Sequence, residues 1–226
     1  MKYMISVIVP VYNEEKIIKQ FLSPFSYNCG LEVIVVDGQS SDKTVEFAKQ
    51  YPVKVIQCVK NRAAQMNEGA KIAQKDILLF LHADCLVERG SLEDINDCLN
   101  NGYIGGCLSQ RITSDKIIYR FIEASGNIRS NISKIFYGDQ AIFVKKDKFL
   151  KLGGFNGVAL FEDALFSKKL KKEGRLRVLN NKVFVSPRRW EKNGIMKTTF
   201  INWILTLGFM LGMPLDILKR IYADVR

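Results

Sequence analysis

Polar residues suited to binding a nucleotide follow two apolar runs near the start of the sequence. The run Ile5–Val9 leads into Pro-Val-Tyr-Asn-Glu at 10–14, and the run Glu32–Val36 leads into Asp-Gly-Gln-Ser-Ser-Asp at 37–42. An acid such as Asp37 can accept hydrogen bonds from a base or ribose, and the start of a following helix attracts phosphate. The pattern predicts a binding crevice, with an ordinary Asp-Gly turn as the structural alternative.

A third apolar run, Ile77–Leu81, leads directly into His82-Ala83-Asp84. Asp84 is a candidate ligand for Mg²⁺ or Mn²⁺, whose octahedral shell diphosphate oxygens would complete. His82 is the one histidine in the sequence, which excludes every triad that needs a different histidine. It is either a second metal ligand or a hydrogen-bonded residue at a strand end.

Two common phosphate-binding motifs are missing from the sequence. No G-x-G-x-x-G follows the first run, and no G-x-x-x-x-G-K-[ST] occurs anywhere. Dinucleotide dehydrogenases and P-loop NTPases are therefore disfavoured. Any bound diphosphate would need a divalent metal and arginines to balance its charge.

The elements that would position these residues alternate between strand and helix in the first half. Short aliphatic runs predict buried strands at Ile5–Val9, Glu32–Val36, Val53–Cys58 and Ile77–Leu81. Helical spacing predicts helices at Glu14–Leu22, Lys43–Lys49 and Arg62–Gln74. This order favours right-handed βαβ crossovers and an α/β, Rossmann-like fold with a mostly parallel central sheet flanked by helices.

The alternation is weaker after about residue 100. Strands are predicted at Gly105–Arg111 and Gln140–Val144, and helices at Ser114–Ser133 and Asp163–Glu173. No Ser- or Pro-rich linker separates the halves. We therefore expect one domain over residues 1–195, followed by a helical extension over 196–226.

Composition and charge limit the possible partners. The 226 residues are 47% hydrophobic and 25% charged, which is typical of a globular domain. The five cysteines lack C-x-x-C spacing, so we expect neither zinc nor disulfides but a reducing, cytoplasmic location. The net charge of +11 lies in the second half, which carries 23 Lys+Arg against 10 Asp+Glu over residues 111–226. Such a field favours nucleic acid, a phosphorylated substrate or lipid headgroups, or is a solvated basic face.

An ordered set of motifs covers residues 4–190. It contains V-I-V-P-V-Y-N-E at 7–14, V-V-D-G-Q-S-S-D-K-T at 35–44, R-x-x-Q-M-N-x-G-A at 62–70, L-L-F-L-H-A-D at 78–84, G-D-Q at 138–140, G-G-F at 153–155, E-D at 162–163 and S-P-R-R-W at 186–190. This set resembles the inverting family 2 glycosyltransferases. Within them it looks like the small bacterial radical-SAM/selenodomain-associated branch.

The resemblance implies a GT-A fold with a nucleotide-sugar half at 1–110 and an acceptor half at 111–195. It also implies roles for individual residues. Asp163 would be the catalytic base beside Glu162, although the pair also suits the acidic first turn of a helix. Asp84 and His82 would hold the metal. The donor would be bound by Pro10, Tyr12, Glu14, Asp37, Arg62, Gln65, Asn67, Asp84, Asp139, Arg188, Arg189 and Trp190.

The sequence departs from the family pattern at two positions. His82 replaces the first acid of the D-x-D motif, which puts strict metal dependence in question. Ser186 replaces the glutamine of Q-x-x-R-W, which argues against processive polymerisation. Inverting transfer is a single displacement in which a carboxylate deprotonates the acceptor while metal and arginine stabilise the departing diphosphate.

Two other functions are weighed against this one. A sugar-phosphate nucleotidyltransferase shares the architecture, but it would need a Gly- and Lys/Arg-rich loop where this sequence has the acidic stretch 12–15. A basic nucleic-acid-binding module would need a regular series of aromatic residues for base stacking, and the lysine clusters at 145–151 and 168–172 have no such aromatic register. We therefore expect a UDP- or GDP-linked sugar as the donor and no nucleic acid partner.

The C-terminal region carries an apolar face flanked by cations. The face comprises Phe200, Trp203, Ile204, Leu207, Met210 and Leu211, and the flanking residues are Arg188, Arg189, Lys192, Lys197, Lys219 and Arg220. The stretch Phe200–Leu215 falls short of the ~20 residues of a spanning helix. Three interpretations stay open: a helix lying on anionic lipid at the inner face of the membrane near a lipid-linked acceptor, packing on the domain, or a homodimer seam.

Overall fold

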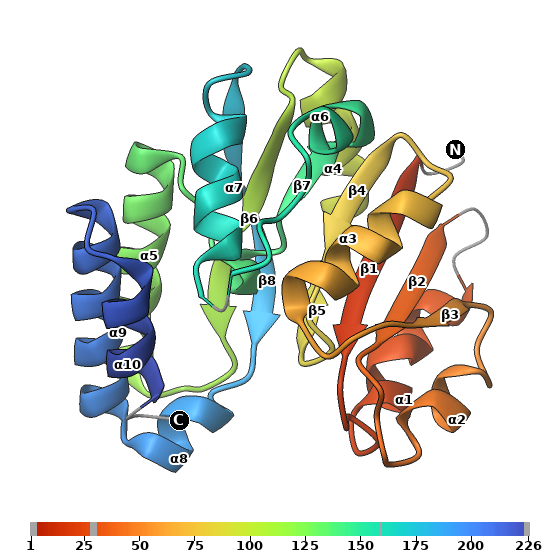
Figure 1. Cartoon of the computed structure of the whole chain (residues 1–226), viewed down its shortest axis with the longest axis horizontal. Helices are drawn as coiled ribbons and strands as arrows, with labels where there is room; N and C mark the ends of the chain where they lie inside the picture. The colour runs from red at the N-terminus through yellow and green to blue at the C-terminus, as the bar shows by residue number, and fades with distance from the viewer. Residues whose placement is uncertain (1–3, 28–30, 159, 224–226) are drawn as a thin grey trace.

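The computed structural model describes residues 4–27, 31–158 and 160–223. A single eight-stranded sheet runs through both halves in the order β3-β2-β1-β4-β7-β6-β8-β5, with helices on both faces (Figure 1). The strands are β1 Ile5–Val11, β2 Glu32–Asp37, β3 Lys54–Gln57, β4 Ile77–Phe80, β5 Cys85–Val87, β6 Gly105–Ile112, β7 Phe143–Lys145 and β8 Leu176–Val185. The helices are α1 Ile18–Leu22, α2 Thr44–Ala48, α3 Arg62–Ile72, α4 Ser91–Asn100, α5 Ile117–Ser133, α6 Lys146–Lys151, α7 Glu162–Leu170, α8 Arg188–Asn193, α9 Ile195–Met210 and α10 Leu215–Ala223. Two short 3₁₀ helices, η1 Ser23–Tyr27 and η2 Gly138–Gln140, complete the elements.

The four strands predicted in the first half form a parallel unit. β1 pairs in parallel with β2 and β4, and β2 pairs in parallel with β3. Every residue of β2 and β4 is buried, as expected for aliphatic strands covered on both faces. The register sets Val11 opposite Asp37, so the polar segments after β1 and β2 meet at one edge of the sheet.

The expectation of a mostly parallel sheet needs correction, because the sheet is mixed. β7 runs antiparallel to β4 and β6, and β5 runs antiparallel to β8, while β6 and β8 are parallel. The predicted strand Gln140–Val144 is also shorter than expected. Gln140 closes η2 and Ala141 has a positive φ of 51°, so the extended backbone of β7 begins only at Phe143.

Two hydrophobic cores fill the two faces of the sheet. Alternate residues of β1 point to opposite faces of the sheet, so Val7 and Val9 belong to one core and Ile8 belongs to the other. A third, smaller core joins α7 to the C-terminal helices through residues including Phe161, Leu205 and Phe209. This core fixes α9 and α10 beside α7.

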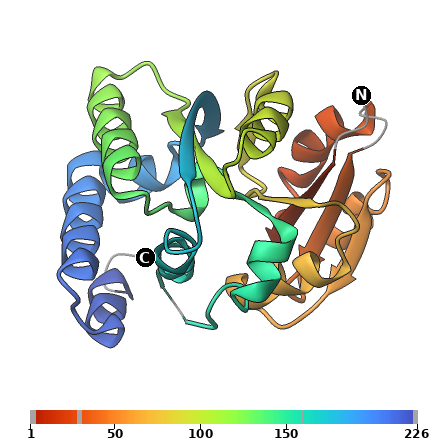
Figure 2. The same ribbon diagram turned by 90° about the horizontal axis from the view of Figure 1, so that it is seen from above.

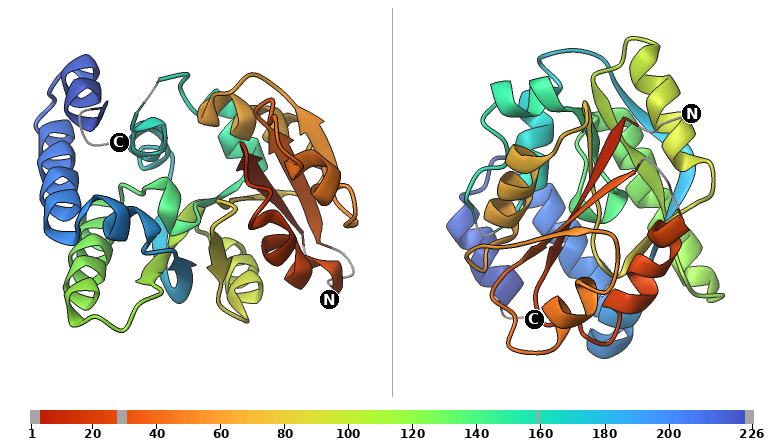
Figure 3. Two further views of the ribbon diagram at one scale, coloured as in Figure 1. Left: turned by 90° about the horizontal axis from the view of Figure 1, so that it is seen from below. Right: turned by 90° about the vertical axis from the view of Figure 1, so that its right-hand side faces the viewer.

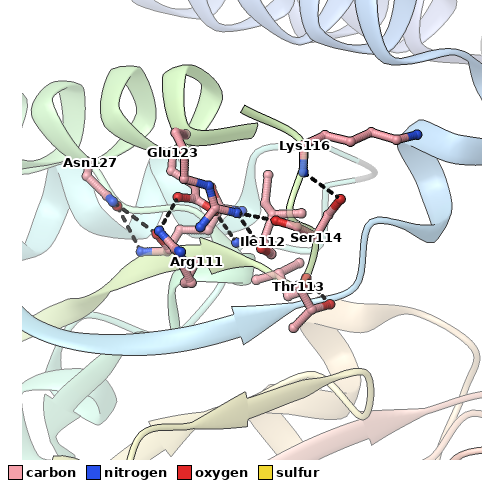
Figure 4. A network of polar contacts seen from close by, with 10 residues as sticks. Arg111, Ile112, Thr113, Ser114, Lys116, Glu123 and Asn127 are labelled. Carbon is pink, nitrogen blue, oxygen red and sulfur yellow. Dashed lines mark hydrogen bonds and ion pairs between the residues drawn. The ribbon is translucent and has the colours of Figure 1, made fainter. Parts of the chain in front are cut away.

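Helix α5 is tied to β6 by buried polar contacts (Figure 4). Glu123 is 5% exposed and accepts from the backbone N–H of Ile112 at 2.5 Å, with Arg120 at 3.0 Å and Arg111 at 3.4 Å from its carboxylate. One turn further, the Asn127 amide both accepts from and donates to the Gln110 backbone. These contacts set the rotation of α5 about its axis.

The apolar face predicted in the C-terminal region lies on α9 and at its end. Its six residues are exposed, from 38% at Ile204 to 75% at Leu211, so the interpretation that this face packs on the domain is wrong. Helices α9 and α5 lie side by side at the edge of the molecule farthest from β3 (Figures 2 and 3). No helix among the described residues is long and apolar enough to cross a membrane. Residues 224–226 of the predicted extension and Cys29 lie outside the described residues.

Candidate active site

A pocket of about 320 Å³ lies where the carboxyl end of β4 meets η2 and helices α5, α7, α8 and α9. Eight of the residues predicted from sequence line it: Arg62, His82, Asp84, Asp139, Glu162, Asp163, Arg189 and Trp190. They come from five separate stretches of the chain, so the fold assembles them. A second pocket of about 340 Å³ adjoins it and shares Asp84 and Ser186.

The Glu162-Asp163 pair lies at the start of α7, on the wall of the pocket. Phe161 precedes the pair with a left-handed φ of 64°, and Asp163 is only 8% exposed. Its carboxylate accepts hydrogen bonds from the backbone N–H groups of Gly138 and Ala164. Burial and the neighbouring Glu162 charge raise the pKa of Asp163 to about 7, which is suited to a general base at neutral pH.

His82 projects toward the same point from the end of β4. A Cβ atom built on Gly138 would lie 2.8 Å from His82 Nε2 and 3.3 Å from Asp163 Oδ2, so both side chains contact the one face of Gly138. Burial, with a further contribution from the Arg62 charge, lowers the pKa of His82 to about 3. The imidazole is therefore neutral.

Three arginines line the pocket. Arg62 Nη1 lies 3.7 Å from Glu162 Oε1, Arg129 stacks 4.2 Å from the centre of the Tyr137 ring, and Arg189 lies 4.9 Å from that of Tyr222. Arginine clusters of this kind suit phosphate oxygens.

Several pocket groups are buried without a hydrogen-bond partner among the described residues: His82 Nε2, Arg129 Nε and Trp190 Nε1. Buried polar groups are almost always paired, so unpaired groups around one cavity indicate a ligand with acceptor oxygens. Asp139 is buried in the same wall and accepts from Gln110 Nε2 at 2.6 Å, and its burial raises its pKa.

Few side chains of the pocket are suited to coordinate a metal ion. Asp84 is exposed at the pocket, and its carboxylate accepts a weak 3.7 Å contact from Cys85 Sγ. No three His, Cys, Asp or Glu side chains within the described ranges cluster closely enough to hold an ion by themselves. One carboxylate fits an ion that takes its other ligands from diphosphate and water, as Mg²⁺ usually does.

Three of the predicted donor-binding residues make hydrogen bonds within the fold. Asp37 is fully buried and accepts from the Ser40 N–H and from Gln57 Nε2. Gln65 Nε2 donates to two backbone carbonyls, that of Val11 at the end of β1 and that of Val36 one residue before the end of β2. Asn67 exchanges two hydrogen bonds with the Phe155 backbone.

The remaining predicted residues lie near the ends of β1 and β8. Pro10 is half-buried in β1, and Tyr12 is 36% exposed with Lys60 Nζ 3.6 Å from its ring centre. Burial raises the pKa of Glu14, an effect opposed by the Arg188 charge and supported by that of Asp84. Glu14 and Arg188 therefore belong to the same electrostatic environment as Asp84.

Sequence reasoning missed several pocket residues. They are Gln110, Arg129, Tyr137, Phe161, Asn202 and Tyr222. Arg129 belongs to a helix that was predicted correctly, but helical periodicity does not say which turn will face a cavity. The repeated arginines of α5 were the available signal.

Comparison with known proteins identifies relatives of this chain. The family model described as "Glycosyl transferase family 2" matches residues 6–158. A glycosyltransferase of Haemophilus influenzae is 30% identical over 184 residues, which is 75% of this chain and 63% of that protein. The dolichol-phosphate mannosyltransferase of Pyrococcus furiosus is 30% identical over 107 residues, which is 43% of this chain and 30% of that protein. The alignments thus span less than two thirds of these relatives.

Solved structures share the fold. TarS 1–349 of S. aureus in complex with UDP-GlcNAc superposes with a TM-score of 0.65 at 20% identity, covering 82% of this chain and 58% of that one. The mannosyltransferase PcManGT of Pyrobaculum calidifontis in complex with GDP-Man and Mn²⁺ gives a TM-score of 0.65 at 23% identity, covering 81% and 57%. Both support an α/β, GT-A-like fold.

Proposed function

Because this chain belongs to glycosyl transferase family 2, we propose that it transfers a sugar, with inversion, from a nucleotide-diphospho-sugar to an acceptor hydroxyl or phosphate in the pocket around Asp163. The observation that carries the proposal is the meeting of this carboxylate with three arginines and unpaired buried donors in one cavity. A base and a set of diphosphate-binding groups are what a single displacement requires.

Asp163 removes the proton from the acceptor as the new glycosidic bond forms. The bond between the sugar and the donor's β-phosphate breaks, and the diphosphate leaves with the electron pair. The two backbone N–H groups that contact Asp163 fix its orientation, and burial, together with the nearby Glu162 charge, keeps the pKa of Asp163 high enough for the task. Arg62 and Arg189 lie where they can bind the departing diphosphate.

Asp84 would hold a divalent ion, Mn²⁺ or Mg²⁺, together with the donor's diphosphate. Such an ion supplies positive charge against the negative charge that develops on the leaving group. His82 replaces the first acid of the family's motif. Its neutral side chain lies beside Asp163, where it can also contact the donor sugar or the acceptor.

The donor's nucleoside would lie over the edge formed by Pro10, Tyr12 and Glu14. The loop that contains Asp37 is joined to this edge, because Ser41 N donates to Asn13 Oδ1 and Glu14 N donates to Thr44 Oγ1. The donor is then bound only indirectly by Asp37, Gln65 and Asn67, whose hydrogen bonds hold the shape of the loops that contact it. PcManGT and TarS were solved with GDP-Man and UDP-GlcNAc, so a GDP- or UDP-linked sugar is the donor class to test first.

The rival activity, joining a sugar phosphate to a nucleoside triphosphate, is less well supported. The segment after β1 carries Glu14 and Glu15, and Glu15 accepts from the Lys43 backbone, so this loop opposes a triphosphate. A basic nucleic-acid-binding module does not account for the buried carboxylates.

Thermal-shift binding and sugar transfer test the proposal together. UDP- and GDP-sugars are screened with and without Mn²⁺; a ligand at 100 times its Kd adds ~2.7 kcal/mol of stability. Asp163→Asn should retain donor affinity within a few-fold while transfer falls ~10²-fold or more. Asp84→Ala should abolish the effect of metal on binding.

The Lys148→Ala variant serves as a control, because Lys148 lies on α6, away from the pocket. Equal transfer by the Asp163→Asn variant and the wild type would reject Asp163 as the base, and Asp139 would be tested next. Failure of every nucleotide-sugar to bind would reject the proposal.

A further inference from the structure

An extensive exposed apolar surface lies on the outer sides of α5 and α9. On α5 the exposed apolar residues recur at helical spacing, as Ile117, Phe121, Ile128 and Ile132, between 59% and 79% exposed. On α9 and its C-terminal end they are Met196, Phe200, Trp203, Ile204, Leu207, Met210 and Leu211, between 38% and 75% exposed. We call these residues the α5–α9 face. Soluble monomers rarely expose apolar patches of this extent without a partner.

Helical geometry directs this face away from the core. On α5, Glu123 and Ser130 are buried toward the sheet, and the exposed residues lie on the opposite side of the helix. On α9, Leu205 and Phe209 pack into the third core, and the exposed stripe again lies opposite. The two helices lie side by side (Figures 2 and 3), and residues of both line the active-site pocket.

The face is continuous with the pocket. Trp203 is 54% exposed and also lines the pocket, one turn from the pocket residue Thr206. On α5, Ile122 and Arg129 line the pocket on the side adjacent to the exposed stripe. A substrate arriving along the face can therefore reach Asp163 between the two helices.

Charge around the face distinguishes the possible partners. Between residues 188 and 223 the chain has six basic residues, Arg188, Arg189, Lys192, Lys197, Lys219 and Arg220, against two acidic ones, Glu191 and Asp216. In an isologous dimer these cationic ends would be brought near their own copies, which is unfavourable. An anionic surface would be attracted by the same charges.

We propose that the α5–α9 face docks on an anionic lipid bilayer, with α9 lying in the plane of the interface. An apolar stripe with a tryptophan at its edge and lysines or arginines at the ends has the pattern of an interfacial helix. The bilayer delivers an acceptor carried by a lipid to the gap between the helices, where Arg129 can contact its polar head. The acceptor step rests on the proposed function; the docking does not.

Vesicle co-sedimentation tests the docking with the full chain. The vesicles contain either zwitterionic lipid alone or ~30 mol% anionic lipid, at low and high salt. We expect binding to require the anionic lipid and to weaken with salt. The double variant Phe200→Glu plus Leu207→Glu, which changes two exposed residues that do not line the pocket, should bind at least ten-fold more weakly.

A matched variant controls for added charge. Val59→Glu plus Leu150→Glu changes two residues that are 61% and 47% exposed, in the loop between β3 and α3 and on α6, and it should bind vesicles as the wild type does. Equal binding by the two double variants, or no preference for anionic vesicles, overturns the proposal. A dimer that dissociates in the Phe200→Glu plus Leu207→Glu variant and ignores vesicles also overturns it, in favour of a second copy.

The acceptor step has a separate readout. Thermal-shift binding of nucleotide-sugars in the absence of vesicles reports the proposed function, and lipid extraction of labelled sugar reports transfer to a lipid. Donor binding without lipid labelling on anionic vesicles that carry lipid phosphates overturns the lipid acceptor while leaving the proposed glycosyltransferase intact. Failure of every nucleotide-sugar to bind overturns the proposed function.

Discussion

At the residue scale, the side chains of His82 and Asp163 both approach closely to the backbone at Gly138. Gly138 donates its N–H to Asp163, and its Cα faces His82. A side chain at this position would separate two groups that must meet in the pocket.

We therefore expect Gly138→Ala to lower sugar transfer by ~10²-fold, because displacements of about 1 Å at a reacting centre have effects of that size. Gly157→Ala is the control, since an added Cβ there has no neighbour within 4 Å. Steady-state kinetics with circular dichroism as a folding check decide the outcome. Normal turnover in a folded Gly138→Ala variant would mean that His82 and Asp163 need not approach each other.

The raised pKa of Asp163 gives a second residue-scale prediction. A base must be deprotonated, so kcat/KM should rise with pH and level off above an apparent pKa of about 7. The charged groups facing it are Glu162, which raises its pKa, and Arg62, which lowers it, while His82 stays neutral over this range.

Replacing the neighbour checks the assignment. Glu162→Gln removes the repulsive charge and should move the acidic limb of the profile to lower pH. A limb that stays in place would point to a different titrating group.

At the element scale, α5 forms one wall of the pocket. Its buried Glu123 accepts a hydrogen bond from the Ile112 N–H and forms ion pairs with Arg111 and Arg120. These contacts hold the helix in the rotation that turns Arg129 into the pocket. Loss of this buried acceptor leaves the Ile112 N–H unpaired and removes the ion pairs with both arginines.

Glu123→Ala should therefore lower the free energy of unfolding by about 2–3 kcal/mol, or the melting temperature by roughly 5–10 °C. Glu123→Gln keeps an acceptor for Ile112 and should lose less. Glu46→Ala, at an exposed position on α2, should change the free energy by less than ~0.5 kcal/mol. Calorimetry or thermal denaturation measures all three variants, and equal stability of the Ala and Gln variants would contradict this role.

Elements with a strong local pattern could be predicted, and those that depend on distant pairing could not. The runs that became β1, β2 and β4 consist mostly of aliphatic residues, so their burial was evident. β5 has three residues and exists because β8 pairs with it. The sequence of β8 mixes polar and apolar residues around Asn180 and Asn181, so no strand pattern was evident there. The antiparallel pairs of the sheet follow from these non-local contacts.

The residues of the candidate site could likewise be predicted only in part. Residues that follow predicted strands, such as His82 and Asp84, could be assigned to the crevice because strand ends meet at a sheet edge. Arg129 could not, because its place depends on how α5 is rotated by Glu123 and Asn127. Nor could the pattern reveal that Asp37 and Gln65 make their hydrogen bonds within the fold.

At the scale of the whole molecule, the uneven charge should produce weak association with any polyanion. The second half carries an excess of 13 positive charges, the difference between its 23 basic and 10 acidic residues. Attraction of this kind is mainly non-specific and sensitive to salt.

Fluorescence anisotropy with labelled duplex DNA should therefore detect binding at about 50 mM salt and lose it by about 200 mM, with no dependence on base sequence. The donor sugar should bind equally well in the presence of the DNA. Sequence-dependent binding that survives at high salt would restore the nucleic-acid interpretation.

The pairing of β5 with β8 also has a consequence for the order of events at the ribosome. β5 begins at Cys85, immediately after Asp84, and its partners Val183, Phe184 and Val185 are translated about 100 residues later. At 5–20 residues per second, that interval is roughly 5–20 seconds. The parallel unit of β1 to β4 can form as it emerges, while the segment carrying Asp84 has to wait for its partner strand. A nascent chain should therefore complete its binding edge only after residue 185 has left the exit tunnel.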